Sequence, residues 1–585
     1  MERTGAQMIV EALRLEKVDT VFGYPGGAVI PIFDALYDAP DIRVVLTRHE
    51  QAAVHAADGY ARVTGKVGVC IATSGPGATN TVTGLATARF DSVPLVCITG
   101  QVSTAMIGND AFQEADTVGI TQPVTKHNYL VTKRENLAEV LKKSFFLAAN
   151  GRPGPIVVDV PKDIQNQVLE DTYPESVSIR GYKPVDRADP KDLRVLADAL
   201  AKAERPLFFL GGGLVIADAA QAFRKVMRAT GSPAVTSLMG IGVVDSRNPL
   251  NLGMLGMHGA IAANKALSTC DLLVGLGVRF DDRATGDVAR FAPDATIAHV
   301  DIDPSSIGRN VEVDIPVVGD LRTVLDDLLP LLPPYPEAGR LGPWLAEIEE
   351  FKKLESDFAS RESKDEAGLP SPREVLATMR DVFPDSVVAT EVGQNQMWAA
   401  QYLAFSSSRR WLTSGGLGTM GYGFPAAMGA QAADTDRPVL VVAGDGSFQM
   451  NIQELATCVQ EGLPVVVLVL NNGYLGMVRQ WQELFYKRRY SSTCSQAQAS
   501  CPRGCNTPGE HCPPYIPDFA GIAKAYGALG FKTETLAQLK VAAMTARDSR
   551  RPAVIDCRIS REANVWPIVP PGKGNDQMLY EGVSV

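Results

Sequence analysis

The feature that most constrains the fold is a pair of polar turns, each placed directly after a short apolar run typical of a buried strand. One turn is Gly444-Asp445-Gly446-Ser447, and the other is Asn471-Asn472. In a parallel sheet, both turns would lie at the carboxyl ends of buried strands, where open α/β folds bind ligands. Asp445 and Asn472 would each offer an oxygen to Mg²⁺, which shares the rest of its shell with a diphosphate. On its own, however, Gly-Asp-Gly is about as often an ordinary turn.

Size and composition limit the classes of protein that the chain can represent. Its 585 residues suggest about three or four domains of ~150 residues each. A content of 45% apolar and 21% charged residues is ordinary for a soluble globular protein. The net charge of −10 argues against nucleic acid as a main partner. The apolar runs are too short to span a membrane, and the first residues lack an apolar signal core, so we expect a cytoplasmic protein.

Short apolar runs alternate with helical patterns in three sections of the chain. The sections are 1–165, 190–330 and 373–585, and a linker rich in proline and charge, 331–372, carries one amphipathic helix. This alternation predicts an α/β protein with three doubly wound parallel-sheet domains and helices on both faces of each sheet. The strand-like runs outside the two polar turns are 67–72, 94–99, 155–160, 206–210, 272–277 and 297–303.

A carboxylate stands at the head of an alanine-rich helical pattern, at Glu50. A buried carboxylate is costly unless it is paired or has a function. The alternative is an ordinary acidic residue in the first helical turn, where the helix dipole favours it. The helix alone favours the second interpretation, and the surrounding motifs reverse that preference.

Motifs along nearly the whole chain, taken in order, resemble those of the thiamine-diphosphate-dependent enzymes. Among these enzymes, the chain resembles more closely the catalytic subunits of biosynthetic acetolactate synthase (acetohydroxyacid synthase). Each motif is weak alone, but the ordered set is highly specific. The motifs are residues 24–28, 49–53, 74–78, 110–114, 125–129, 151–155, 159–163, 254–259, 277–283, 415–421, 444–447, 471–472, 475–481 and 569–572.

The resemblance implies a pyrimidine-binding domain, a central FAD-binding domain and a diphosphate-binding domain, with thiamine diphosphate, Mg²⁺ and FAD as cofactors. Mg²⁺ would be held by Asp445, Asn472 and the backbone carbonyl of Tyr474. Glu50, from the partner subunit of a dimer, would hydrogen-bond the pyrimidine ring. The other expected contacts of thiamine diphosphate are Gln394, Gly418, Met420, Gly444, Gly446 and Ser447.

The implied reaction decarboxylates pyruvate and transfers the hydroxyethyl unit to pyruvate or 2-oxobutanoate. The product is 2-acetolactate or 2-aceto-2-hydroxybutyrate, at the first common step of valine, leucine and isoleucine biosynthesis. Gly27 and Gln113 would stabilise oxyanions, and Arg283 would grip the carboxylate of the second acid. Alternatively, Arg283 forms only an ion pair with its neighbouring aspartates. The other expected substrate contacts are Phe112, Lys162, Met257, Met477 and Trp481.

By the same resemblance, the central section would bind FAD as a structural cofactor. The residues expected to hold it are Arg152, Gly212, Gly213, His258, Gly277, Arg279, Asp281, Asp301, Ile302 and Asp320. The main rival within this enzyme class is another thiamine-diphosphate-dependent carboligase, oxidase or decarboxylase. Retention of Glu50 disfavours glyoxylate carboligase, since that family lacks the equivalent acid. We also expect a homodimer or tetramer and a separate small regulatory subunit.

Three features depart from the family pattern. Asn395 follows Gln394 where a histidine is usual, and Gly473 replaces a larger polar residue beside Asn472. The third is a segment from Thr493 to Pro514, where the family has a short connection. It contains Cys494, Cys501, Cys505, His511 and Cys512. These residues could bind zinc, form a disulfide, or pack in a loop as free thiols.

Overall fold

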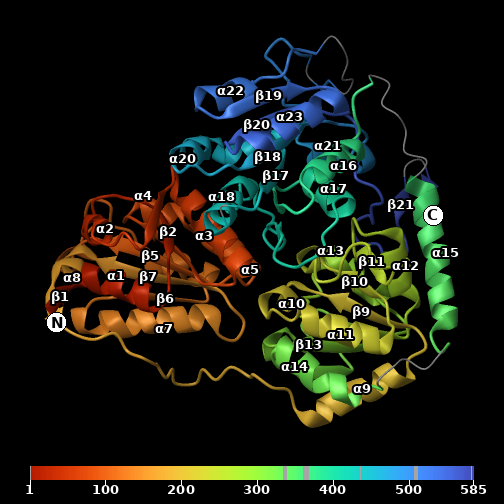
Figure 1. Cartoon of the computed structure of the whole chain (residues 1–585), viewed down its shortest axis with the longest axis horizontal. Coiled ribbons are helices and arrows are strands. Elements are labelled where there is room, and N and C mark those ends of the chain that lie inside the picture. Colours follow the sequence, from red (N-terminus) through yellow and green to blue (C-terminus); the bar gives the residue numbers. More distant parts are fainter. Residues whose placement is uncertain are drawn as a thin grey trace. The chain divides into compact units, whose positions relative to one another are not determined.

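The computed structural model describes residues 2–333, 339–359, 368–434, 436–502, 504–505, 512–580 and 583–584. The chain divides into two compact units. The first unit consists of Met1–Lys183, Asp381–Gln396 and Leu412–Arg561, and the second consists of Pro184–Arg380, Met397–Trp411 and Glu562–Val585. Two six-stranded sheets belong to the first unit and one to the second (Figure 1).

The N-terminal domain is built on a parallel six-stranded sheet of order β3-β2-β4-β5-β7-β6. Its central strands are buried along their whole length, because apolar helices cover both faces. The strands are β2 (Thr20–Tyr24), β3 (Arg43–Leu46), β4 (Gly68–Ala72), β5 (Leu95–Gln101), β6 (His127–Leu130) and β7 (Pro155–Pro161), and the short strands β1 (Glu2–Thr4) and β8 (Val168–Glu170) pair separately. The helices are α1 (Gly5–Leu15), α2 (Ile30–Tyr37), α3 (Glu50–Thr64), α4 (Pro76–Asn80), α5 (Val82–Phe90), α6 (Thr117–Thr121), α7 (Leu137–Ala149) and α8 (Lys162–Asn166).

The C-terminal domain has a sheet of order β16-β15-β17-β18-β20-β19. Its strands are β15 (Val387–Thr390), β16 (Trp411–Leu412), β17 (Val439–Gly444), β18 (Val466–Asn471), β19 (Leu529–Thr533) and β20 (Ala553–Arg558). The helices are α16 (Pro372–Val382), α17 (Gln394–Tyr402), α18 (Gly423–Ala433), α19 (Asp445–Phe448), α20 (Leu455–Gln460), α21 (Gly476–Phe485), α22 (Phe519–Ala525) and α23 (Leu536–Ser549), with the 3-10 helix η8 (Gln449–Glu454).

Helices α3 and α18 join these two domains of the first unit by packing unusually closely. A Cβ atom added to Gly59 would lie 2.0 Å from the carbonyl oxygen of Ala426, and one added to Gly429 would lie 1.8 Å from that of Ala56. Larger side chains would therefore push the helices apart. This contact fixes helix α3, which begins at Glu50, against the C-terminal domain.

The second unit contains the central sheet, of order β11-β10-β9-β12-β13-β14, whose strands pair in parallel. The strands are β9 (Pro206–Leu210), β10 (Ala234–Thr236), β11 (Asn251–Met254), β12 (Leu272–Leu276), β13 (Thr296–Asp301) and β14 (Ile315–Val318), with a terminal hairpin of β21 (Leu579–Tyr580) and β22 (Val583–Ser584). The helices are α9 (Pro190–Lys202), α10 (Gly212–Ile216), α11 (Ala220–Thr230), α12 (Ile261–Thr269), α13 (Asp282–Thr285), α14 (Leu321–Leu328) and α15 (Gly342–Ala359).

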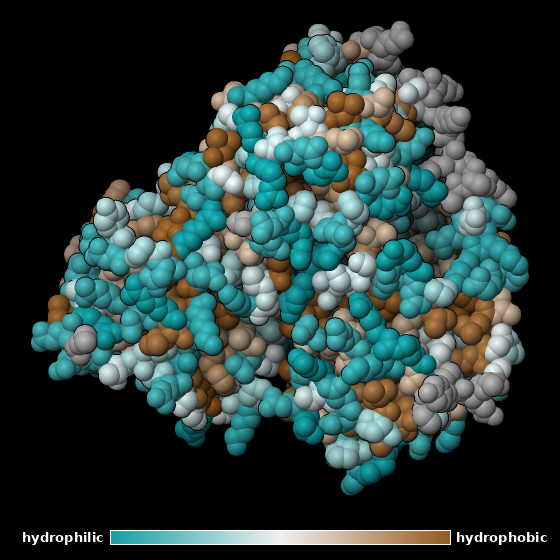
Figure 2. Space-filling model, in the orientation of Figure 1, coloured by the Kyte–Doolittle hydropathy of each residue, from teal (hydrophilic) through white to brown (hydrophobic). Residues whose placement is uncertain are grey.

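The prediction of three parallel-sheet α/β domains is confirmed, and each strand-like run of the sequence forms a strand. The expected helix of the linker is α15, while residues 334–338 and 360–367 of that linker lie outside the described part. The domain boundaries stay predictions. On the face shown in Figure 2, polar residues predominate and hydrophobic residues form scattered patches. No helix in the described ranges is long and apolar enough to cross a bilayer.

Candidate active site

The two polar turns lie at the same edge of the C-terminal sheet. Strands β17 and β18 are parallel neighbours, with Gly444 directly beside Leu470. Asp445 and Asn472 each follow the last residue of one of these strands. The side chains proposed to bind a metal therefore come from adjacent strand ends, where ligands bind in open α/β sheets.

Asp445 has the environment expected of a metal ligand. It is 1% exposed, and its Oδ2 atom has no hydrogen-bond partner among the described residues. Burial raises the pKa of Asp445 to about 7, although a hydrogen bond from the Tyr515 hydroxyl opposes that shift. A buried carboxylate oxygen without a partner is destabilising unless something satisfies it, and a cation does so directly. The residues present therefore fit Mg²⁺.

The residues around Asn472 form a chain of amides. Asn472 Oδ1 accepts from the backbone N–H of Tyr474 at 3.0 Å, and its Nδ2 donates to Gln394 Oε1 at 3.2 Å. Gln394 Nε2 in turn donates to Gln480 Oε1 at 2.9 Å. This chain fixes which way the Asn472 oxygen points, and it connects the candidate metal ligand to a residue expected to contact the diphosphate. No group of three His, Cys, Asp or Glu residues suited to a metal is found in the described ranges, but this donor set contains only one such residue.

Asn395, the first departure from the family pattern, has a structural role. Its buried side chain donates from Nδ2 to the carbonyl oxygens of Glu391 and Val442, at 3.0 and 2.9 Å. It thereby joins helix α17 to strand β17 immediately below the Gly444 turn. The Asn395 side chain therefore supports the turn from inside the protein.

The turn after β17 is tight and is built on glycine. The backbone N–H of Gly444 donates to Ser447 Oγ at 3.2 Å, which fixes that hydroxyl within the turn. A Cβ atom on Gly446 would lie 2.5 Å from the side chain of Leu475, so the turn has no space for a larger residue. The turn can thus present backbone groups directly to an anion.

Gly418 and Met420 belong to the connection between β16 and α18, which is exposed only at Leu417 and Gly418. Gly418 has φ +73°, a conformation that favours glycine, and it is exposed together with Leu417. Sequence reasoning missed a residue beneath this connection, the buried Glu391. Its carboxylate accepts from the backbone N–H groups of Gly421 and Phe424, at 2.6 and 3.0 Å, and burial raises its pKa to about 7. Glu391 satisfies N–H groups at the start of α18 that have no partner within the helix.

Glu50 begins helix α3 and is 9% exposed. One carboxylate oxygen, Oε2, accepts from Asn80 Nδ2 at 3.0 Å. The backbone immediately before it is held from the C-terminal domain, because both oxygens of Glu454 accept from the N–H of Arg48, at 3.0 and 3.1 Å. Glu50 is therefore a buried carboxylate with a fixed backbone. Neither Glu454 nor Asn80 was predicted from the sequence.

The residues expected to stabilise oxyanions lie on loops of the N-terminal domain. A Cβ atom on Gly27 would meet no atom within 4 Å, so its backbone faces open space. Gln113 has φ +59°, and its backbone lies against Gly75 in the adjacent loop. Phe112 is 88% exposed in this chain. A large apolar side chain with this exposure is typical of a surface that binds another molecule. Lys162 is the first residue of α8.

Two expected substrate residues of the second unit are neighbours. The N–H of Met257 donates to the carbonyl oxygen of Arg283 at 2.8 Å, and the guanidinium lies 3.9 Å from the Met257 sulfur. Arg283 also lies 3.8 Å from Asp282, but both side chains are well exposed, so this ion pair contributes little. In the first unit, Met477 and Trp481 lie one turn apart on α21.

The residues expected to bind FAD fall in both units. Arg152 is in the N-terminal domain, where its Nε donates to Ser92 Oγ at 2.8 Å. In the central domain, Gly212 begins α10, β13 ends at Asp301, and Asp320 caps α14. The other expected residues of the central domain are Gly213, His258, Gly277, Arg279, Asp281 and Ile302. Within this set, burial lowers the pKa of His258 to about 4, and its Nδ1 has no partner in the described part.

The cysteine-rich segment is attached to the candidate metal loop. The N–H of Leu475 donates to Thr493 O, and that of Ser495 donates to Gly473 O, both at 2.9 Å. Tyr474 and Cys494 thus form an antiparallel bridge. Cys494 and Cys501 are free thiols, and His511 lies outside the described residues. The second departure, Gly473, packs on Gln496 of this same segment.

Comparison with known proteins agrees with this organisation. Family models for thiamine pyrophosphate enzymes match residues 3–120 (N-terminal TPP binding domain), 193–328 (central domain) and 391–557 (C-terminal TPP binding domain). The acetolactate synthase large subunit of Corynebacterium glutamicum is 46% identical over 580 residues, covering 99% of this chain and 90% of that protein. The acetolactate synthase isozyme 3 large subunit of Escherichia coli is 45% identical over 588 residues, covering 98% of each chain. The large subunit of Haemophilus influenzae is 43% identical over 585 residues, again covering 98% of each.

Proposed function

Since this chain belongs to the acetolactate synthase large subunits, a family of thiamine pyrophosphate enzymes, we propose how its residues divide the catalytic work. The chain is a thiamine-diphosphate-dependent transferase. It decarboxylates pyruvate and transfers the hydroxyethyl unit to pyruvate or 2-oxobutanoate, which yields 2-acetolactate or 2-aceto-2-hydroxybutyrate. This reaction is the first common step of branched-chain amino acid biosynthesis.

The cofactor site is proposed at the carboxyl edge of β17 and β18. The observation that carries the proposal is the buried, unpartnered Oδ2 of Asp445 beside the fixed amide of Asn472. Asp445, Asn472 and the carbonyl of Tyr474 would hold Mg²⁺. The phosphates would contact Gln394, Gly444, Gly446 and Ser447. When bound, thiamine diphosphate supplies the carbanion chemistry, and the protein supplies orientation and charge.

Glu50 is proposed as the acid that hydrogen-bonds the pyrimidine ring. Its burial and its bond to Asn80 support that role, because they hold the carboxylate away from bulk water in one orientation. We propose that Glu50 acts on a cofactor held by a second copy of the chain. The active enzyme is then a homodimer or a tetramer built from such dimers.

The substrates are proposed to meet groups from several loops. The Gly27 N–H and Gln113 would stabilise developing negative charge on substrate oxygens. Arg283, whose partner Asp282 is weakly held, is available to bind the carboxylate of the second acid. Apolar contact would come from Phe112, Met257, Met477 and Trp481, with Lys162 at the entrance.

FAD is proposed as a structural cofactor of the central domain, held by the residues given above together with Arg152. As an acetolactate synthase large subunit, the chain uses pyruvate as its substrate. Its partner is a small regulatory subunit. A cytoplasmic location is proposed from the biosynthetic reaction.

The experiment that tests this function is product formation from pyruvate by the purified chain, with thiamine diphosphate, Mg²⁺ and FAD omitted in turn. Acetolactate that requires all three, without oxygen consumption, is the expected result. Acetaldehyde, hydrogen peroxide, or acetolactate formed without FAD would instead indicate a related activity.

A further inference from the structure

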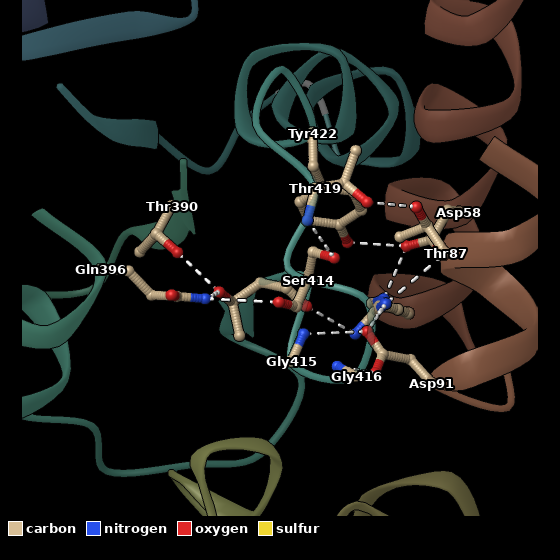
Figure 3. Close-up of polar contacts among 12 residues, drawn as sticks. Asp58, Thr87, Asp91, Thr390, Gln396, Ser414, Gly415, Gly416, Thr419 and Tyr422 are labelled. Atoms are coloured by element: carbon tan, nitrogen blue, oxygen red, sulfur yellow. Dashed lines mark hydrogen bonds and ion pairs between the residues drawn. The ribbon is translucent and has the colours of Figure 1, made fainter. Parts of the chain in front are cut away.

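A buried carboxylate at the end of α5 holds the connection that carries Gly418 and Met420. We call residues 413–422 the cofactor segment. Asp91, whose side chain is 1% exposed, accepts from the backbone N–H groups of Gly416 and Gly415, at 2.8 and 3.1 Å. Asp91 belongs to the N-terminal domain, whereas the segment belongs to the C-terminal domain (Figure 3). The contact therefore joins two domains of one chain.

Arg62, on helix α3, connects Asp91 to a second buried carboxylate. Its guanidinium bonds Asp58 at 2.6 Å, Asp91 at 2.9 Å and the carbonyl oxygen of Thr413 at 3.2 Å. The hydroxyl of Tyr422, at the other end of the segment, donates to Asp58 at 2.6 Å. Two carboxylates face one cation in this cluster. The excess negative charge is offset by the glycine N–H groups and the tyrosine hydroxyl, all of which are contributed by the segment.

The middle of the segment is held as well, while its tip is left open. The hydroxyls of Thr87, on α5, and Thr419 lie 2.7 Å apart, and the N–H of Thr419 donates to Ser414 Oγ at 3.0 Å. Figure 3 shows these contacts on one side of the segment. Between the held positions, Leu417 and Gly418 remain exposed. Both ends of a short exposed tip are thus fixed by helices of the N-terminal domain.

We propose that Asp91 and Arg62 are positioning residues for thiamine diphosphate. By holding the cofactor segment, they set the backbone around Gly418 and Met420 in the shape that receives the pyrimidine before the cofactor arrives. This inference rests on the proposed function of that segment. It adds that the N-terminal domain acts on the cofactor site of its own chain through Asp91 and Arg62, in addition to the role proposed for Glu50 at the partner's site.

The test measures binding of thiamine diphosphate to the apo full-length protein by calorimetry at saturating Mg²⁺. Asp91→Ala removes the acceptor of two N–H groups and one guanidinium, so the Kd should rise by ~10-fold or more, as expected for hydrogen bonds to a charged group. Thr87→Val removes only the hydroxyl contact and should raise the Kd by a smaller factor. In both variants, kcat at saturating cofactor should fall much less than the apparent affinity does.

A matched control separates positioning from general stability. Leu141→Ala creates a cavity in the core of the N-terminal domain, where Leu141 packs among apolar side chains away from the contacts described above. It should lower Tm without changing the Kd. If Asp91→Ala does not fold, the Kd values of the two milder variants, Thr87→Val and Asp91→Asn, test the inference instead. A Kd unchanged in all folded variants would overturn the inference. Absence of cofactor binding in the unsubstituted protein would instead contradict the proposed function.

Discussion

The two carboxylate oxygens of Glu454 share the backbone N–H of Arg48 in a bifurcated hydrogen bond, at 3.0 and 3.1 Å. Arg48 lies two residues before Glu50, and Glu454 lies on the C-terminal domain. The start of α3 is therefore fixed by the domain that also carries Asp445. This contact, together with the hydrogen bond from Asn80, explains how one carboxylate can be held in place at the head of a helix.

Glu50→Gln tests the role of that carboxylate. The amide keeps the size of the side chain and one acceptor oxygen, but it cannot exchange a proton with the cofactor. We expect kcat to fall by at least ~100-fold, as for loss of a general acid–base group, with the Kd of thiamine diphosphate within about threefold. Steady-state kinetics and a cofactor titration measure the two effects. Unchanged turnover would show that Glu50 has another role.

Glu454→Gln tests the buried contact between the two domains through its pH dependence. Burial raises the pKa of Glu454 from an ordinary 4.5 to about 7, so the folded state binds more protons than the unfolded state in that range. The contribution of this carboxyl to the free energy of unfolding therefore falls as pH rises from about 4.5 to about 7. The Tm of the wild type, relative to the variant, should fall over the same range.

Thermal unfolding at a fixed scan rate, at several pH values, measures this difference. Glu534→Gln, at an exposed position, is the matched control, and its Tm difference from the wild type should not change with pH. A flat difference for Glu454→Gln as well would mean that the carboxyl does not titrate in that window.

Trp481→Leu tests the choice between the two acceptor acids. Trp481 is predicted to make a favourable contact with the extra methyl group of 2-oxobutanoate. Loss of the tryptophan should therefore shift selectivity toward pyruvate by roughly 10-fold, which is within the range for one methylene. Competition between the two acids, with both products quantified, gives the ratio. Val478→Ala, at an exposed position on the same helix, should leave it unchanged. An equal ratio in wild type and Trp481→Leu would place the selectivity elsewhere.

Although Cys494 and Cys501 are free thiols in the structure, we predict that zinc or a redox-dependent disulfide cross-links the cysteine-rich segment in the native protein. Its first residues pair with the loop that follows Asn472, so a staple there would stiffen the metal site. Elemental analysis and thiol titration of the native protein distinguish the alternatives. Absence of zinc, together with four titratable thiols in the segment, would exclude both kinds of staple.

The sequence predicted the fold class because burial of parallel strands leaves continuous apolar runs, and it predicted the edge carrying Asp445 and Asn472 because both follow such runs. It did not predict Glu391, Glu454 or the cluster of Arg62 with Asp58 and Asp91. Glu391, Glu454, Asp91 and Arg62 each bind a backbone group at least 30 positions away in the chain, and no local pattern marks such pairs. Only the pair of Arg62 with Asp58, four residues apart on α3, is local. Asn395 was predicted only as a departure, since its two carbonyl partners depend on the packing of α17 on β17.

We propose that Glu50 of one subunit completes the site formed by Asp445 of another. The most direct test of this proposal mixes two inactive variants, Glu50→Gln and Asp445→Ala, by co-expression with different tags and purification of the mixed dimer. If the site is shared, one of the two sites in the mixed dimer has both native residues, and acetolactate formation should return to roughly half the wild-type rate per dimer. If each site instead uses Glu50 and Asp445 of the same chain, the mixed dimer stays as inactive as either variant alone, which would contradict the account.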